Sequence, residues 1–341
     1  REEGLRRQLV ALQQRSLADT SRRQYNATWG QWTAFSHQLG RSPWLPQNDE
    51  VAQSLQLVLF AIDRWSAAPS NVQPRAISTI HTQVSHVKWF HRVYAGFEPA
   101  ITPSHATAFA GMRRLSPVPE PRTPVSPAML EWIAENIDYE NPQHRLFLGA
   151  ALLGFFYLLR SSEYLAVKGG RHRYALEVRD VQVCEATGGP AFTIARASYA
   201  VINLRGSKTD QQGLNTARSL SRSGHARVCP VLGAAMLLEL AERLGLRSHD
   251  ALCSLSRTRM LKAEELSKVL KAAAVGIGAD PRRVSCHSLR SGGATALIAN
   301  GVDSTTIKLH GCWKSSAFQR YTQYSSKVGE PLAALMTGNS N

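Results

Sequence analysis

Apolar residues recur at helical spacing through the first third of the chain. A first helix should begin near Thr20 or Ser21, and two further apolar segments follow it over residues 51–65 and 77–90. We therefore expect residues 1–115 to form a small helical domain. The apolar face of the first helix is aromatic, and core packing explains it better than stacking on nucleic-acid bases. Its members are Tyr25, Trp29, Trp32 and Phe35.

The segment over residues 77–90 predicts a helix with a second, basic face. Its apolar positions keep helical steps, and the opposite side carries basic residues that continue to Arg92. A solvated face and a face that contacts phosphate groups explain this pattern equally well. The residues that would contact phosphate there, together with an Arg pair further along the chain, are Lys88, His91, Arg92, Arg113 and Arg114.

Residues 116–127 read SPVPEPRTPVSP and contain five prolines. Proline interrupts both helices and central strands, so this stretch predicts an extended, semi-rigid linker. We therefore place a domain boundary here, between a helical domain over residues 1–115 and a second domain over residues 128–341.

The second domain combines helices with a short β-rich region. A run of 14 apolar residues, Leu146 to Leu159, predicts a buried helix and is too short to span a bilayer. β-Rich text at 192–194 and 200–204 predicts strands, and 206–210 reads as a hairpin turn that contains Lys208. Further amphipathic helices are expected over 230–246 and 261–274. The fold class is thus mainly α with a small β-sheet.

Three short elements near the C-terminus carry a cluster of polar and aromatic residues. His287 and Arg290 fall in the first turn of a helix that should stop at Gly301. Asp303 or Ser304 can cap a second short helix that ends near Gly311. Trp313 follows, and a last helix, capped by Ser315 or Ser316, would carry Tyr321. Tight turns between these elements can bring His, Arg, Trp and Tyr around one point.

These side chains suit the attack of a phenol on a phosphodiester. A guanidinium group binds two phosphate oxygens and keeps its proton. Histidine and the indole N–H add hydrogen bonds, histidine can also move a proton, and tyrosine can act as the nucleophile.

The composition favours a polyanionic partner. The chain holds 40 Lys and Arg against 25 Asp and Glu, a net charge of +15, which makes nucleic acid the first candidate. Its five cysteines include no C-x-x-C pair, which argues against a zinc site and a disulfide framework and fits a reducing compartment. We expect no metal and no cofactor.

The motifs resemble those of the tyrosine recombinase (phage integrase) family. That family's signature is a distant Arg, a Lys in a hairpin turn, His-x-x-Arg, His or Trp, and then Tyr. The text Leu-Arg-Ser-Gly-Gly-Ala-Thr over 289–295, followed by Gly-x-Trp-Lys-Ser over 311–315, looks most like the Crypton type of eukaryotic mobile elements. The matching catalytic positions are Arg160, Lys208, His287, Arg290, Trp313 and Tyr321, with Glu163 in support.

The resemblance decides two positions that the pattern leaves open. Alone, Arg160 and Glu163 could form a surface pair and Lys208 could be an ordinary turn lysine. Two tyrosines compete for the nucleophile: Tyr321 lies 8 positions after Trp313 and Tyr324 lies 11 after it, and the spacing and the text Arg-Tyr-Thr favour Tyr321.

The resemblance also implies a function and partners. It implies a helical core-binding domain joined to a mixed α+β catalytic domain, and a recombinase that cleaves and rejoins double-stranded DNA through a 3′-phosphotyrosyl bond without metal or ATP. It implies a tetramer on DNA, with the C-terminal tail at 331–336 docking in trans. The location would be the nucleus for a eukaryotic mobile element and otherwise the cytoplasm. A type IB topoisomerase and a domesticated, non-catalytic DNA-binding protein remain as alternatives.

Overall fold

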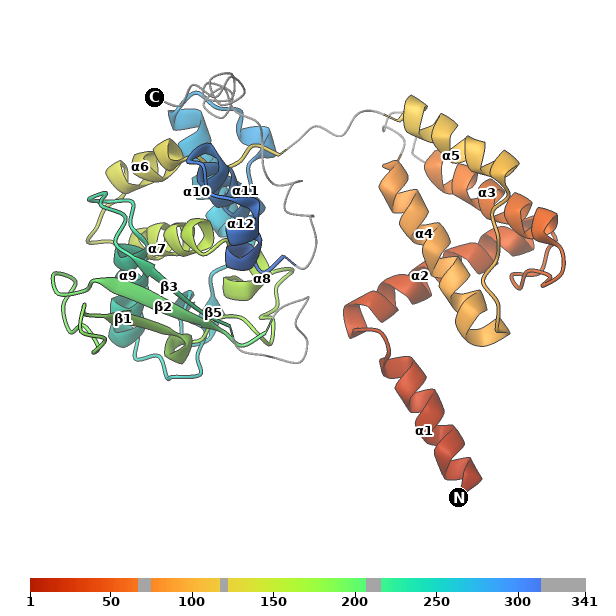
Figure 1. Ribbon diagram of the computed structural model, residues 1–341, viewed down its shortest axis with the longest axis horizontal. Helices are drawn as coiled ribbons and strands as arrows, with labels where there is room; N and C mark the ends of the chain where they lie inside the picture. The colour runs from red at the N-terminus through yellow and green to blue at the C-terminus, as the bar shows by residue number, and fades with distance from the viewer. Residues whose placement is uncertain (67–74, 117–121, 207–215, 314–341) are drawn as a thin grey trace. The chain divides into compact units, whose positions relative to one another are not determined.

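The computed structural model describes residues 1–66, 75–116, 122–206 and 216–313. The chain divides into two compact units, Arg1–Glu120 and Pro121–Asn341, and the division falls inside the stretch predicted as a linker (Figure 1). Throughout the described ranges, no helix is long and apolar enough to cross a membrane.

The first unit is built from helices, as its sequence pattern predicts. Helix α4 passes directly into a π-helical turn, η1, before the chain continues to the last helix (Figure 1). The elements are α1 (Glu2–Arg15), α2 (Asp19–Gln38), α3 (Glu50–Ser66), α4 (Ile77–Phe90), η1 (His91–Ala95) and α5 (Pro103–Leu115).

The aromatic face of α2 forms the core of this unit. Trp32 is fully buried, and its ring meets Phe60 of α3 edge-to-face with 5.3 Å between the ring centroids. The Trp32 indole N–H donates to the carbonyl of Pro43 at 2.7 Å, so its only polar atom is satisfied. The prediction that this aromatic stripe is core is confirmed for Trp32 and Phe35, with Trp29 packed against them, whereas Tyr25 is half-buried and outside this core.

His91 does not lie on the basic face of α4. Its side chain is fully buried, and its Nε2 accepts a hydrogen bond from the Leu45 N–H at 3.0 Å. Its Nδ1 lies 2.9 Å from the carbonyl of Val87, to which it donates. The prediction that His91 contacts DNA is therefore wrong. His91 follows the buried Val84 and Val87 by seven and four residues, so α-helical spacing already places it on their face of the helix.

The other predicted basic residues of this unit lie at its surface. Lys88 and Arg92 flank Glu98, with nitrogen–oxygen distances of 3.1 and 3.4 Å. Arg113 and Arg114 are exposed in the last turn of α5, where positive charge complements the negative end of the helix dipole.

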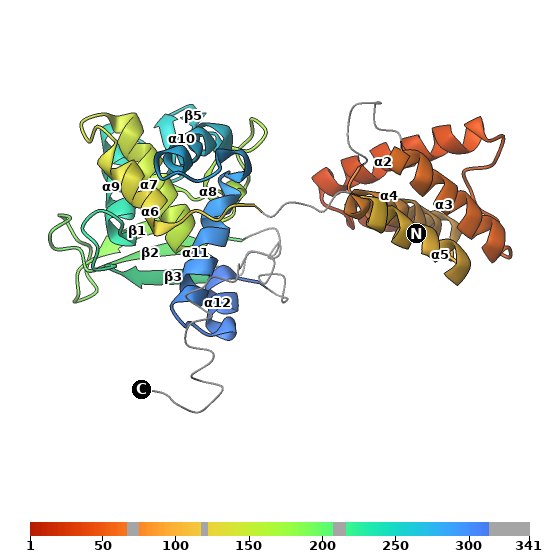
Figure 2. The same ribbon diagram turned by 90° about the horizontal axis from the view of Figure 1, so that it is seen from above.

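The second unit packs helices around a small antiparallel sheet. In Figures 1 and 2, α9 lies against the sheet and packs along α7, and α11 and α12 follow each other on the α7 side. The helices are α6 (Pro127–Glu135), α7 (Pro142–Phe156), α8 (Ser161–Tyr164), α9 (Pro230–Arg243), α10 (Ala263–Gly276), α11 (His287–Ala299) and α12 (Ser304–Gly311), with short 3₁₀ turns η2 (Val178–Asp180) and η3 (Pro281–Arg283). The strands are β1 (Val181–Cys184), β2 (Tyr199–Leu204), β3 (Thr216–Ser221), β4 (Ser254–Ser256) and β5 (Arg259–Met260).

The main sheet has the order β1-β2-β3, with Val181 opposite Ile202 and Ile202 opposite Arg218. The strand predicted at 200–204 is confirmed as part of β2. The strand predicted at 192–194 is wrong: Phe192 is 85% exposed and this text lies in the connection between β1 and β2. Strand propensity depends on an available partner, and β1 already occupies that edge of β2.

The apolar run at 146–159 is buried as predicted, and two glycines let its helix pack closely. A side chain at Gly149 of α7 would meet Leu237 of α9 at 2.8 Å, and one at Gly233 of α9 would meet Leu152 of α7 at the same distance. Helix α7 ends at Phe156 rather than at Arg160, because Leu158 takes a left-handed conformation with φ of 51°.

Part of the proline-containing stretch predicted as a linker, residues 116–127, packs against the second unit. Val125 is 1% exposed, and its N–H donates to the carbonyl of Ser288 in α11 at 2.9 Å. Ser126 caps α6 by accepting from the Met129 N–H at 3.3 Å. Residues 122–126 therefore belong to the second unit.

The buried histidines of the first unit predict that its stability falls on acidification. Burial lowers the pKa of both His86 and His91 below the ordinary value of about 6.5. Below that value the histidines of the unfolded chain bind protons that the buried histidines of the folded unit do not bind. Their contribution to stability is therefore present above about pH 6.5 and is lost as the pH falls. The urea midpoint should drop between pH 7.5 and 5.5.

Tryptophan fluorescence can follow this transition, because Trp29, Trp32, Trp44, Trp65 and Trp89 all lie in the first unit. Replacing both histidines by Gln keeps a donor and an acceptor but removes the titration, and should flatten the pH dependence. A wild-type midpoint that stays constant across this range contradicts the prediction.

Candidate active site

The candidate site is built around the C-terminal end of α7. The carbonyl of Phe156 lies 2.7 Å from Nε2 of His310, the carbonyl of Tyr157 accepts from Arg218 at 3.0 Å, and the carbonyl of Leu158 accepts from Arg290. The last carbonyls of a helix have no partner within the helix and form the negative end of its dipole. Three basic side chains from β3, α11 and α12 therefore cap this end, two residues before Arg160.

Arg290 joins two turns that contain left-handed residues. It donates to Leu158, whose φ is 51°, and at 2.6 Å to the carbonyl of Gly311, which precedes Cys312 with φ of 48°. Arg218 reaches the same pair of turns, because it contacts the Cys312 sulfur as well as Tyr157. Residues other than glycine rarely take this backbone conformation, so the turns at Leu158 and Cys312 depend on these buried arginines.

The Gly-x-Trp motif has a steric explanation. A Cβ at Gly311 would overlap the indole ring of Trp313, so the ring lies directly over the glycine backbone. The Trp313 ring also stacks on the Arg290 guanidinium, with 4.1 Å between the guanidinium carbon and the ring centroid. Such a cation–π contact favours the charged, planar group and fixes its orientation.

Arg160 and Glu163 form more than a surface pair. The Arg160 N–H donates to Oε2 of Glu163 at 2.7 Å, and the guanidinium donates to Oε1 at the same distance. Glu163 is buried, whereas the Arg160 side chain is 22% exposed. The carboxylate thus caps α8 and at the same time holds the guanidinium in one orientation, with part of it open to solvent.

His287 begins α11 and lies close to three cations. Burial, and then the positive charges of Arg122, Arg290 and Arg160, lower the pKa of His287 to about 4. The imidazole is therefore uncharged at neutral pH and can accept a proton or a hydrogen bond. Any anion that binds among these guanidinium groups would raise that pKa.

The structure brings five of the predicted residues into this region: Arg160, Glu163, His287, Arg290 and Trp313. Lys208 and Tyr321 lie outside the described residues, and their roles stay predictions. Asp303 caps α12 by accepting from the N–H groups of Thr305 and Thr306 at 2.8 and 3.0 Å, which confirms one of the two predicted caps.

Sequence reasoning missed Arg122, Arg218 and His310. Arg218 stands opposite Ile202, whose side chain is buried, so a predicted β3 would have placed this cation on the inner face of the sheet. His310 directly precedes the Gly-x-Trp motif, and Arg122 lay in text taken as linker. Each needs a long-range contact to reveal its role.

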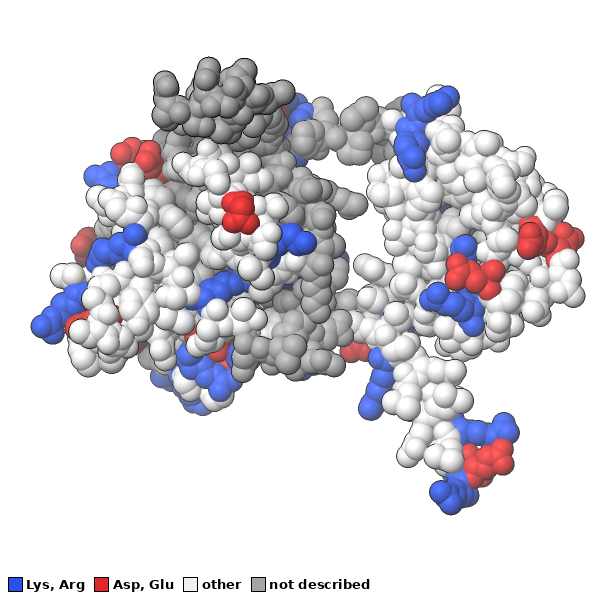
Figure 3. Space-filling model, viewed as in Figure 1, with Lys and Arg blue, Asp and Glu red and all other residues white. Residues whose placement is uncertain are grey.

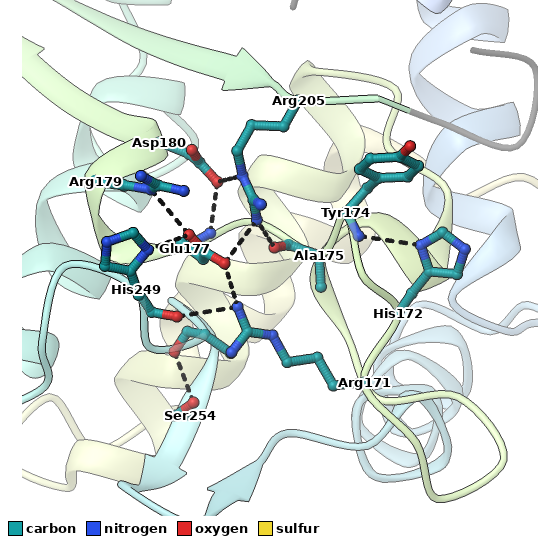
Figure 4. Close-up of polar contacts among 11 residues, drawn as sticks. Arg171, His172, Tyr174, Ala175, Glu177, Arg179, Asp180, Arg205, His249 and Ser254 are labelled. Atoms are coloured by element: carbon teal, nitrogen blue, oxygen red, sulfur yellow. Dashed lines mark hydrogen bonds and ion pairs between the residues drawn. The ribbon is translucent and has the colours of Figure 1, made fainter. Parts of the chain in front are cut away.

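The chain segment that carries Lys208 starts from a dense network of ion pairs. Arg205, the residue after β2, donates to Asp180 at 2.8 Å and to the carbonyl of Ala175 at 2.7 Å, and pairs with Glu177 at 3.0 Å (Figure 4). Arg171 and Arg179 also bind the buried Glu177, at 2.7 and 2.9 Å. These contacts fix where the chain leaves the sheet, three residues before Lys208.

Metal-binding chemistry has no obvious place in the part of the chain that the structure describes. No group of three or more His, Cys, Asp or Glu side chains is placed to hold a metal ion there. The five cysteines are unpaired, and burial raises the pKa of Cys253 to about 12, so this thiol stays protonated.

Comparison with known proteins shows the fold. No protein-family model and no curated protein sequence matches the chain. Among solved structures, the XerH site-specific recombinase bound to its palindromic difH substrate matches 83% of this chain and 70% of its own, with a TM-score of 0.54 and 14% identity.

Two further solved structures match nearly the whole chain. The Tn1549 transposon integrase in complex with transposon right end DNA matches 97% of this chain and 98% of its own, with a TM-score of 0.52 and 13% identity. A lambda integrase dimer bound to a core site matches 95% of this chain and 95% of the integrase chain, with a TM-score of 0.51 and 14% identity. The chain therefore has the tyrosine recombinase fold, with a core-binding and a catalytic domain.

The contacts of Arg290 predict a large structural cost for its loss. Arg290→Ala would leave two buried carbonyls without a donor and open a cavity, so we expect a destabilisation of about 3 kcal/mol. Arg196→Ala is the matched control, because that arginine is 71% exposed and its pairing with Glu185 is loose at 3.6 Å. Its effect should stay within about 0.5 kcal/mol.

Urea unfolding followed by circular dichroism measures both variants. Equal stability of the Arg290→Ala and Arg196→Ala proteins would show that the turns around Leu158 and Gly311 form without the guanidinium.

Proposed function

We propose that this protein, which has the tyrosine recombinase fold, cleaves and rejoins DNA strands through a covalent bond between Tyr321 and a 3′-phosphate. The observation that supports this best is the gathering of Arg160, His287, Arg290 and Trp313 at the end of α7, from segments up to 153 positions apart. These are the residue types that a reacting phosphodiester needs, and they come together with little negative charge beside them.

The guanidinium groups would stabilise the charge that develops on the non-bridging oxygens. Arg160 is partly exposed and already oriented by Glu163, so it can meet phosphate directly. Arg290 is 2% exposed and holds the surrounding turns, so its charge acts from beneath the site. Donors and charges fixed in advance stabilise a transition state without reorganising, which is the main source of catalysis expected here.

Two proton transfers complete the step. The Tyr321 hydroxyl would lose its proton to the uncharged His287 as its oxygen attacks phosphorus. The bond from phosphorus to the 5′-oxygen breaks, and Lys208 would protonate that oxygen as it leaves. The products are a 3′-phosphotyrosyl bond and a free 5′-hydroxyl.

Rejoining would run the same steps in reverse. A 5′-hydroxyl attacks the phosphotyrosyl phosphorus, Tyr321 leaves, and one phosphodiester replaces another. The phosphotyrosyl bond conserves the energy of the cleaved phosphodiester bond, so the cycle would require no ATP. The arginines would neutralise the phosphate charge that a metal ion neutralises in other enzymes.

The finer assignments rest on the motif text. The Leu-Arg-Ser-Gly-Gly-Ala-Thr and Gly-x-Trp-Lys-Ser stretches support a Crypton-like mobile element. The family resemblance alone implies four protomers on two duplexes, with the tail at 331–336, which lies outside the described residues, docking in trans. Terminal repeats in the DNA that flanks the coding sequence would support the mobile-element origin. Their absence would favour a domesticated protein.

The nucleophile is tested by trapping the covalent intermediate. The substrate is a pool of nicked duplexes with randomised sequence. Cleavage releases the strand fragment that carries the 5′-hydroxyl, so the cleaved strand cannot be rejoined. Protein-linked strands can then be recovered under denaturing conditions and sequenced. Tyr321→Phe should abolish the adduct, because phenylalanine lacks the attacking oxygen. Tyr324→Phe, the matched control three residues away, should retain most of it.

The other outcomes are equally informative. An adduct lost only in Tyr324→Phe moves the nucleophile by three residues. An adduct that survives both changes shows that another side chain is the nucleophile. No adduct from the wild type ends the covalent mechanism and leaves a DNA-binding protein. Relaxation of a supercoiled plasmid that lacks the recovered sequence would indicate the topoisomerase alternative.

The net charge predicts strongly salt-dependent DNA binding. On the face drawn in Figure 3, Lys and Arg side chains are spread over both units rather than confined to one stripe. We therefore expect roughly 6–10 phosphate contacts, each contributing a slope of about −0.9 to log affinity against log salt. Binding to a duplex of about 30 base pairs at several salt concentrations measures this slope, and a flat dependence would rule out the DNA-binding function.

A further inference from the structure

The start of the second unit lies in backbone contact with α11. Val125 is 1% exposed, and its N–H donates to the Ser288 carbonyl at 2.9 Å. One helical turn further on, a Cβ at Gly292 would overlap the backbone of Val125, so only glycine admits the segment at this position. Both views show this segment running along α11 before it enters α6 (Figures 1 and 2). We call residues 122–125 the clasp.

The clasp carries a cation to the reactive centre. Arg122 is its first residue and is exposed, three positions before the anchored Val125. Val125 is anchored at Ser288, the neighbour of His287, so Arg122 lies three residues from a backbone contact in the first turn of α11. Among the charged side chains that act on His287, Arg122 exerts the strongest effect, ahead of Arg290 and Arg160. The backbone anchor at Val125 and the electrostatic effect on His287 thus both connect Arg122 with the first turn of α11.

We propose that Arg122 is a further substrate-binding residue, whose guanidinium binds the DNA phosphate that lies against His287. This inference rests on the proposed function. Arg122 is exposed, whereas Arg290 is 2% exposed and bonded to two backbone carbonyls. An exposed guanidinium on an anchored backbone can reach a phosphate oxygen without disturbing the turns around Leu158 and Gly311.

Arg122 has a second consequence, for the protonation of His287. A protonated His287 would be repelled by Arg122 of the clasp, by Arg160 at the start of α8 and by Arg290 of α11 itself. Of the other titratable groups nearby, His310 of α12 is bonded to the carbonyl of Phe156, and Glu163 is bound to Arg160. Arg122 thus helps to keep His287 uncharged and ready to accept the proton of the nucleophile. When a phosphate anion binds, this repulsion is offset and the proton can be held.

The test compares Arg122→Ala and Arg122→Lys with Arg196→Ala, an exposed control that removes one positive charge from the β1–β2 connection. Nuclear magnetic resonance of histidine-labelled protein first follows the titration of His287 without DNA. Arg122→Ala should move this titration to higher pH, because the largest repulsion is lost. Arg122→Lys should restore it, and Arg196→Ala should leave it in place.

The same signal can detect an oxyanion. Inorganic phosphate should shift the His287 resonance of the wild type and of Arg196→Ala, and about tenfold more phosphate should be needed with Arg122→Ala. In single-turnover cleavage of nicked duplexes, Arg122→Ala should form the covalent adduct about 10²-fold more slowly at saturating DNA, as for the loss of one donor to a reacting oxyanion. Arg122→Lys should recover part of that rate.

The outcomes separate this inference from the proposed function. If the wild type forms no adduct but its His287 responds to phosphate through Arg122, the proposed chemistry fails and the phosphate site stands. If the wild type forms the adduct while Arg122→Ala matches Arg196→Ala in titration, phosphate response and rate, the inference on Arg122 is overturned.

Discussion

The interaction on which the second unit depends is the capping of one helix end. Helix α7 is almost wholly apolar and buried, so its last carbonyls cannot be satisfied by water. His310, Arg218 and Arg290 supply the missing donors to Phe156, Tyr157 and Leu158, and they come from α12, β3 and α11. The need to satisfy three buried carbonyls thus draws three distant elements to one point, and Arg160 follows that point in the chain.

That arrangement concentrates positive charge that the described protein neutralises only in part. Glu163 is bound to Arg160, while Arg290 is neutralised by carbonyl dipoles and an aromatic face rather than by a carboxylate among its described contacts. His287 responds by staying uncharged. Under the proposed function, a phosphodiester would bring negative charge to this site and its bond-breaking transition state would bring more, so these fixed positive charges would favour the transition state.

Local rules predicted the parts of this design that are local. The helix that opens with His287, the Asp303 cap and the buried run before Arg160 follow from spacing and capping preferences. The roles of Arg218 and Arg122 could not be predicted in this way, because each is set by a contact with a residue more than 60 positions away. His91 was misplaced for a different reason, since it follows the buried Val84 and Val87 by seven and four residues and shares their face of the helix. Phe192 shows that β propensity without a free strand edge does not form a strand.

Two glycines explain why the sequence around the site tolerates little variation in shape. Gly292 lets the backbone of Val125 lie against α11, and Gly311 lets the Trp313 ring lie against the end of α12. In both places a side chain would separate surfaces that must touch, and the cation positioned by that contact, Arg122 in one case and Arg290 in the other, would move with it. Misplacement by about 1 Å can reduce catalysis 10²-fold. Under the proposed function, these two glycines would therefore constrain the chemistry as firmly as the arginines do, although neither glycine has a functional group that could contact the substrate.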